Sequence, residues 1–193
     1  MTTDVLSTTT PVEPQKFQKQ NLTVAVNVGV AANSGMRRKR ADTHLNEEVR
    51  EALMKSVQTW TESGDVAIRY IYYATTSNIT NFFNTWKEAK ENFDHNYLAQ
   101  PVDNTNQTRA VESFVPSVGR STFMLVVPDN SAYSDADIRA NDFHRTGSLL
   151  NEINVTEVIL FSTNQTINEV RSEYNMIREA RIVTDASDLT NSI

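Results

Sequence analysis

Three histidines are the first residues to examine for chemistry, because imidazole can act as a general base or a metal ligand near neutral pH. The pattern places His44 at the start of a helix, His95 in a loop and His144 inside a helix. Their spacing does not match shared metal ligation. The chain has no cysteine, which excludes disulfides, thiolate zinc sites and a cysteine nucleophile. We therefore expect surface or capping roles for the histidines.

The motifs of nucleotide-binding and nucleophilic enzymes are also missing. The sequence has no Gly-x-x-x-x-Gly-Lys-Ser/Thr, no Gly-x-Gly-x-x-Gly and no Gly-x-Ser-x-Gly. Pairs of acidic residues, such as Asp135 and Asp137, stand at the starts of predicted helices, where the helix dipole favours negative charge. The sequence thus supplies no catalytic residue, and we predict that the protein is not an enzyme.

One basic run remains as a candidate binding element. Four cations, Arg37, Arg38, Lys39 and Arg40, follow a valine-rich stretch. They could attract an acidic group of a protein partner through charge-assisted hydrogen bonds. Two other interpretations stay open: a solvated loop without a partner, and a recognition sequence for a dibasic protease or an import receptor.

The composition limits the class of partner and leaves the compartment open. The net charge of −6 and the sequence pI near 5.1 argue against nucleic acid as the main partner, because that role needs a broad basic surface. No apolar run is long enough to span a bilayer, so we expect no membrane insertion. If Met1 is the native start, the protein is expected inside the cell. A piece of a longer secreted protein would instead be extracellular.

Hydrophobic patterning predicts one folded domain behind a tail. Residues 1–20 are rich in Thr, Pro and Gln and read as a disordered linker, and the domain covers residues 21–193. Runs of β-branched and apolar residues predict strands at 22–30, 66–73, 122–127, 155–162 and 181–184. Apolar residues three to four apart predict helices at 43–60, 78–93, 135–150, broken near Gly147, and 167–177. The alternation predicts a three-layer α/β fold, with a doubly wound, mainly parallel sheet covered by helices on both faces.

Three stretches in collinear order resemble the von Willebrand factor type A (VWA) domain over residues 22–189. Residues 105–111, Thr-Asn-Gln-Thr-Arg-Ala-Val, resemble the family's Thr-x-Thr-Gly-x-Ala-Leu loop. Residues 123–130 resemble the strand that ends in Thr-Asp-Gly, with Asp129 on its aspartate. The closing strand, helix, strand and Asp-Leu ending are matched by residues 158–162, 167–171 and 181–189.

The resemblance implies a degenerate metal-ion-dependent adhesion site. The family holds a divalent cation through Asp-x-Ser-x-Ser, the threonine and the aspartate, and magnesium requires such oxygen ligands. Here residues 27–31 read Asn-Val-Gly-Val-Ala, so Asn27 replaces the charged ligand and both serine hydroxyls are lost. Asn27, Thr105 and Asp129 are therefore expected to form a vestigial site with weak or absent magnesium or manganese binding, and no cofactor.

These observations favour a non-enzymatic protein-binding module of the adhesion, matrix or assembly type. Its partner is expected at the loops that follow the strands, and the partner-binding candidates are Arg37, Arg38, Lys39, Arg40, Asp129 and Asn130. Two alternatives remain. One is a small α/β enzyme that uses Asp129, and the other is a structural subunit of a viral or cellular assembly. The sequence does not indicate an oligomeric state.

Five Asn-x-Thr triplets could accept glycans in a secreted setting. Asn154 stands directly before a predicted buried strand, where a glycan would clash. The remaining candidate acceptors are Asn21, Asn78, Asn106 and Asn164. A chain this rich in Asn, Thr and Ser produces such triplets by chance, so they give little support for a secreted glycoprotein.

Overall fold

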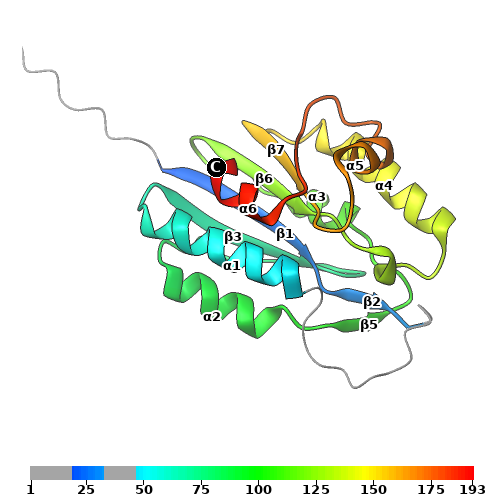
Figure 1. Ribbon diagram of the computed structural model, residues 1–193, viewed down its shortest axis with the longest axis horizontal. Helices are drawn as coiled ribbons and strands as arrows, with labels where there is room; N and C mark the ends of the chain where they lie inside the picture. Colours follow the sequence, from blue (N-terminus) through cyan, green and yellow to red (C-terminus); the bar gives the residue numbers. More distant parts are fainter. Residues whose placement is uncertain (1–18, 33–46) are drawn as a thin grey trace, which may run out of the picture.

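A six-stranded sheet forms the centre of the molecule (Figure 1). The computed structural model describes residues 19–32 and 47–193. In the order in which they lie side by side, the strands are β4 (Ser77–Ile79), β3 (Val66–Tyr73), β1 (Gln20–Asn27), β6 (Ser121–Val126), β7 (Glu157–Phe161) and β8 (Arg181–Val183). All neighbours pair in parallel except β3 and β4. The predicted doubly wound α/β architecture is confirmed.

Helices cover both faces of the sheet. The first face packs against α1 (Glu47–Glu62), α2 (Trp86–Asn96) and α6 (Ala186–Leu189). The second face packs against α3 (Thr108–Glu112), α4 (Ala136–Leu150) and α5 (Ile167–Glu173). Two short 3-10 helices, η1 (Asn130–Ala132) and η2 (Thr190–Ser192), complete the described elements. None of the helices in the described residues has the length and apolar character of a membrane span.

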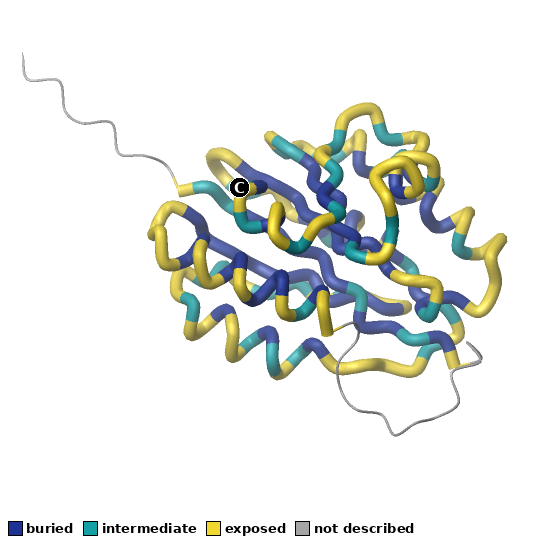
Figure 2. The backbone as a smooth tube through the Cα atoms, in the orientation of Figure 1, coloured by how far each residue is buried: buried dark blue, intermediate teal, exposed yellow. Residues whose placement is uncertain are grey.

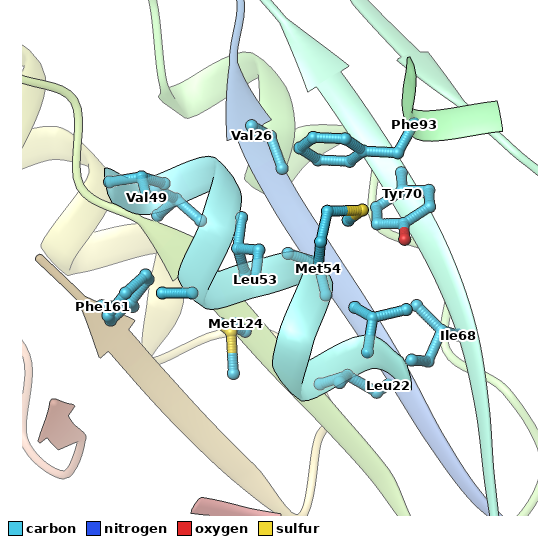
Figure 3. Close-up of a cluster of buried hydrophobic side chains, with 14 of the residues drawn as sticks. Leu22, Val26, Val49, Leu53, Met54, Ile68, Tyr70, Phe93, Met124 and Phe161 are labelled. Carbon is cyan, nitrogen blue, oxygen red and sulfur yellow. The ribbon is translucent and has the colours of Figure 1, made fainter. Parts of the chain in front are cut away.

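The apolar residues of the central strands explain why the sheet is buried on both sides. Figure 2 shows the strands as buried segments between helices with exposed outer surfaces. On the first face, Leu53 of α1 is fully buried and points toward Met124 of β6 (Figure 3). On the second face, Phe143 of α4 and Leu160 of β7 belong to a separate buried cluster. Strands buried on both faces read as continuous apolar runs, which is why the sequence revealed them.

The predicted first strand divides into two. The chain leaves the main sheet at Val28, whose N–H donates to the Tyr73 carbonyl at 2.8 Å and whose carbonyl accepts from the Gln100 N–H at 2.7 Å. Beyond it, β2 (Gly29–Ala31) pairs in parallel with β5 (Gln100–Val102). Residues 100–102, for which the sequence predicted no strand, therefore form one.

The helix predicted at 78–93 is wrong in its first half. Residues 77–79 form the edge strand β4, and Phe83 continues the pairing because its N–H donates to the Ile68 carbonyl at 2.6 Å. The helix α2 begins only at Trp86, because the Thr85 side chain accepts the Glu88 N–H and caps it. α2 continues to Asn96, so His95 lies in its last turn and not in a loop.

Two further expectations about helices are also corrected. α4 runs unbroken through Gly147. A Cβ at this glycine would lie 3.5 Å from the Met176 Cβ, so the residue provides ordinary close packing rather than a break. α5 ends at Glu173 instead of continuing to residue 177.

A buried polar cluster lies inside the second face. The Asp142 carboxylate accepts the Tyr133 hydroxyl at 2.6 Å and the Gln107 backbone N–H at 2.9 Å. The Tyr174 hydroxyl donates to the Gln107 side-chain oxygen at 2.5 Å. Burial raises the pKa of Asp142, and the hydrogen bonds from Tyr133 and Gln107 partly oppose this. The cluster joins α4, the end of α5 and the loop before α3.

The raised pKa of Asp142 predicts a pH-dependent cost of burial. A carboxyl whose folded-state pKa lies above its unfolded value of about 3.9 destabilises the fold as pH rises through that window. Asp142→Asn keeps an acceptor oxygen but cannot ionise. We expect the stability of the variant relative to the unchanged protein to rise as pH increases from about 4 toward neutrality.

Chemical denaturation at a series of pH values would measure this difference in the free energy of unfolding. Asp103→Asn, at an exposed loop position, is the matched control and should show no such trend. A difference between Asp142→Asn and the unchanged protein that stays constant with pH would contradict the prediction.

Candidate functional site

The candidate site lies beyond the carboxyl end of β1, where the order of the strands reverses. The neighbours of β1 are β3 on one side and β6 on the other. In doubly wound sheets this switch point is where ligands bind. Asn27 ends β1, Asp129 follows β6, and Thr105 lies in the loop before α3.

Asn27 and Thr105 are in direct contact. The Thr105 hydroxyl donates to the Asn27 side-chain oxygen at 2.6 Å. The same oxygen accepts the Gly29 N–H at 3.0 Å, and the Asn27 amide nitrogen donates to the Gly29 carbonyl at 2.8 Å. The hydrogen-bonding groups of Asn27 are therefore engaged within the protein. We call this arrangement of Asn27, Gly29 and Thr105 the closed loop contact.

Gly29 is required by the close approach of three neighbours. A Cβ at this position would lie 3.0 Å from the Thr105 hydroxyl oxygen. It would also lie 3.1 Å from the Ala74 Cβ and 3.1 Å from a methyl carbon of Val102. Any side chain at residue 29 would force these atoms apart, because such contacts are shorter than normal packing allows.

Backbone hydrogen bonds hold the Thr105 loop in place. The Thr105 N–H donates to the Ala132 carbonyl at 2.9 Å, and the Asn106 N–H donates to the Ala74 carbonyl at 2.8 Å. The Asn104 side-chain oxygen accepts from the Ser134 N–H at 2.7 Å. Together with the buried polar cluster around Asp142, these bonds connect the loops after β1, β3 and β6.

Asp129 faces the same region but has a separate local role. Its carboxylate accepts from the Ser131 N–H at 2.7 Å and caps η1. Asp129 and Asn27 line a shared small cavity of about 30 Å³, which is about the volume of one water molecule. Tyr97 lines the same cavity, and its pKa is raised first by burial and then by the Asp129 charge.

Asp129 also lines a larger cavity of about 360 Å³. Asp129 and Asn130 line it together with Gln165 and the ion pair between Arg139 and Glu173, whose N and O atoms are 2.6 Å apart. Asp129 and Asn130 are exposed there. The two residues are thus available to a partner at this rim.

The structure brings some of the predicted site residues together and leaves others apart. Asn27, Thr105 and Asp129 lie around one point at the end of the sheet. Arg37, Arg38, Lys39, Arg40 and His44 lie outside the described residues. His95 and His144 are exposed on α2 and α4. Of the candidate glycosylation sites, Asn78 and Asn164 are exposed, as is the disfavoured Asn154, whereas Asn21 and Asn106 are half-buried.

The donor set at this point does not fit a magnesium or manganese ion. Such ions need several oxygen ligands in near-octahedral order. The Asn27 oxygen already accepts two hydrogen bonds, and Gly29 and Ala31 offer no side-chain oxygen. Across the part of the chain that the structure describes, no three His, Cys, Asp or Glu side chains group closely enough to hold a metal.

Sequence reasoning missed the residues that support the site. Asn104, Ser134, Gln107 and Asp142 all act through contacts between distant segments. A signal existed for Asp142, which occupies the position before the apolar Phe143 on the inner side of α4. A single acidic residue in a helix pattern nevertheless gives no indication of its partners.

Comparison with known proteins gives no match to a family model and none to a curated protein sequence. Solved structures do match. A mutant of the PilB minor pilin from Streptococcus sanguinis has a TM-score of 0.60 and 11% identity, over 95% of this chain and 61% of the pilin. The pilus adhesin SpaC from Lactobacillus rhamnosus GG has a TM-score of 0.54 and 8% identity, over 92% of this chain and 30% of the adhesin.

Proximal thread matrix protein 1 from the mussel byssus is also similar, with a TM-score of 0.50 and 12% identity, over 90% of this chain and 46% of that protein. The chain therefore spans between about a third and three fifths of the length of these proteins. At such low identity the similarity concerns the fold. Together with the order of the strands, it establishes a von Willebrand factor type A-like fold for this chain.

Proposed function

We propose that the chain is a non-enzymatic protein-binding module of the adhesion, matrix or assembly type. The solved structures that share its fold include a minor pilin, a pilus adhesin and a matrix protein. The partner binds at the loops beyond the carboxyl ends of the strands, where hydrogen bonds connect the described loops.

The closed loop contact is the observation that carries this proposal. In the metal-dependent form of such a site, oxygens in the positions of Asn27 and Thr105 would hold a cation. Here the Thr105 hydroxyl is directed at Asn27, 2.6 Å away. The cation-binding function is therefore proposed to be weak or lost, and recognition depends on protein side chains instead.

The side chains proposed for partner contact are Asp129 and Asn130 on the described rim and the basic run at Arg37, Arg38, Lys39 and Arg40. The basic run follows β2 in the sequence and lies outside the described residues. Its four charges favour an acidic group on the partner. Asp129 is not proposed as a catalytic base, because its carboxylate is occupied in capping η1.

Partner capture by the immobilised chain tests this function. An extract of the source organism is applied in EDTA or in magnesium, at low and at moderate salt, and bound proteins are identified by mass spectrometry. We expect the same partner in both metal conditions. Replacing Arg37, Arg38, Lys39 and Arg40 by serine should weaken capture, most strongly at low salt, because the contact is electrostatic.

The matched control replaces four exposed cations elsewhere by serine: Lys55, Lys87, Arg120 and Arg145. It should leave capture unchanged. Capture that requires magnesium and disappears in EDTA would contradict the metal-independent mechanism. If capture is unchanged after the basic run is replaced by serine, the basic run is not part of the binding surface.

The closed loop contact also predicts a stability effect. Thr105 is buried, and Thr105→Val keeps its shape but removes the donor to Asn27. We expect a loss of about 1–2 kcal/mol in the free energy of unfolding, even in EDTA, because the half-buried Asn27 oxygen loses one of its two hydrogen-bond donors. Chemical denaturation measures it, with Thr75→Val at an exposed position as the control. A variant that loses stability in magnesium but not in EDTA would indicate that the hydroxyl serves a metal.

A further inference from the structure

A second surface lies at the opposite end of the sheet from the candidate site. A groove of about 910 Å³ opens at the amino ends of β7 and β8. Its walls come from the end of α4, the segment before β7 and the segment between α5 and β8. The groove shares no residue with the cavities that Asp129 lines.

The floor of the groove is an uncovered part of the second core cluster. Val158 and Leu160 of β7 and Tyr174 are buried beneath it. Around them, apolar side chains remain half-buried: Ile153, Val155, Ile177, Ala180 and Ile182. α5 ends after seven residues, and the chain from residue 174 to residue 180, which lies along the groove, forms no further helix before β8. These side chains give the groove a partly apolar lining.

β8 also offers backbone groups to a partner. It is the last strand of the sheet, so within the described residues its outer side has no neighbouring strand. β8 is three residues long and pairs with β7 alone. A free strand edge beside an apolar floor is the arrangement that binds extended peptides by strand addition.

The charges on the rim indicate the chemistry of the partner. Arg171, Arg178 and Arg181 line the groove and are exposed. None of them belongs to an ion pair within the described residues. Glu157 and Glu179 also line the groove, so the lining carries a net positive charge in a chain whose total is −6. The surface is therefore locally complementary to an acidic segment.

We propose that this groove binds an extended acidic segment of a partner protein, which adds to the free edge of β8. Apolar side chains on one face of the segment contact the half-buried Val155, Ile177 and Ile182. Acidic side chains pair with Arg171 and Arg178. Together with the surface at the carboxyl ends of the strands, this gives the chain two binding ends and suits it to connect two partners.

Two other occupants fit the charges less well. The edge strands of a second copy of the chain, β4 and β8, contain no acidic residue and so supply no acidic segment. The chain's own first twenty residues contain two acidic and two basic side chains, Asp4, Glu13, Lys16 and Lys19, so they supply no net negative charge.

A pair of labelled peptides tests the proposal on the full chain. The acidic probe is a nine-residue acetylated peptide in which valine alternates with glutamate and threonine, and the basic probe has lysine in place of glutamate. By fluorescence anisotropy we expect the acidic probe to bind about tenfold more tightly, as expected for a few exposed charge pairs. In amide NMR spectra the acidic probe should shift the signals of Arg181, Ile182 and Val155 and leave the signals of Asn27 and Thr105 unchanged.

Charge reversal distinguishes specific binding of the probe in this groove from nonspecific electrostatic attraction to the protein. The double variant Arg171→Glu, Arg178→Glu should bind the acidic probe about tenfold more weakly and should prefer the basic probe. Lys55→Glu with Arg120→Glu applies the same charge change at exposed positions outside the groove and should change neither preference.

Three results would overturn the proposal. The first is equal affinity for the two probes, and the second is an unchanged preference in the Arg171 and Arg178 variant. The third is protection of the β8 amides from exchange without any probe, accompanied by self-association in sedimentation. That last result would show that a second copy covers the groove.

Discussion

The fold around the candidate site depends on the way β1 leaves the sheet. β1 is a central strand. At its end the chain must provide hydrogen-bond partners for the Asn27 side chain and pass close to the Thr105 loop. The hydrogen bond of 2.6 Å between these two side chains does both. It requires glycine at position 29, because a Cβ would lie 3.0 Å from the Thr105 hydroxyl oxygen. Asparagine and glycine in this short stretch are thus explained together by one contact.

This contact changes how a VWA-like scaffold can be used. In the same place, a charged and hydroxyl-rich loop would leave oxygens free for a cation and, through the cation, for a carboxylate of a ligand. Here the oxygens bond to the protein itself, and the loops are held by the Ala132, Ala74 and Ser134 contacts. We infer that partner binding relies on a preformed surface with fixed side-chain charge. Such a surface can bind its partner without a metal ion.

The strands of the fold could be predicted from the sequence because β3, β6 and β7 are buried on both faces and read as apolar runs. The region around Ile79 and Phe83 could not, since the same apolar residues fit a helix face and an edge strand, and only pairing with Ile68 and Tyr70 decides. β2 and β5 are too short to leave a pattern. The positions of Asn27, Thr105 and Asp129 followed from the resemblance to the family. The hydrogen bond between Asn27 and Thr105, and the Asp142 cluster beneath it, arise from tertiary contacts that no local pattern contains.

Calorimetric titration of the purified chain with magnesium and with manganese tests whether the closed loop contact excludes a cation. If the Thr105 hydroxyl and the Asn27 oxygen are committed to one another, neither metal should give saturable heat at the candidate site. Stoichiometric binding to the unchanged chain that is abolished by Thr105→Val would contradict the account. It would show that the closed contact opens to admit a cation.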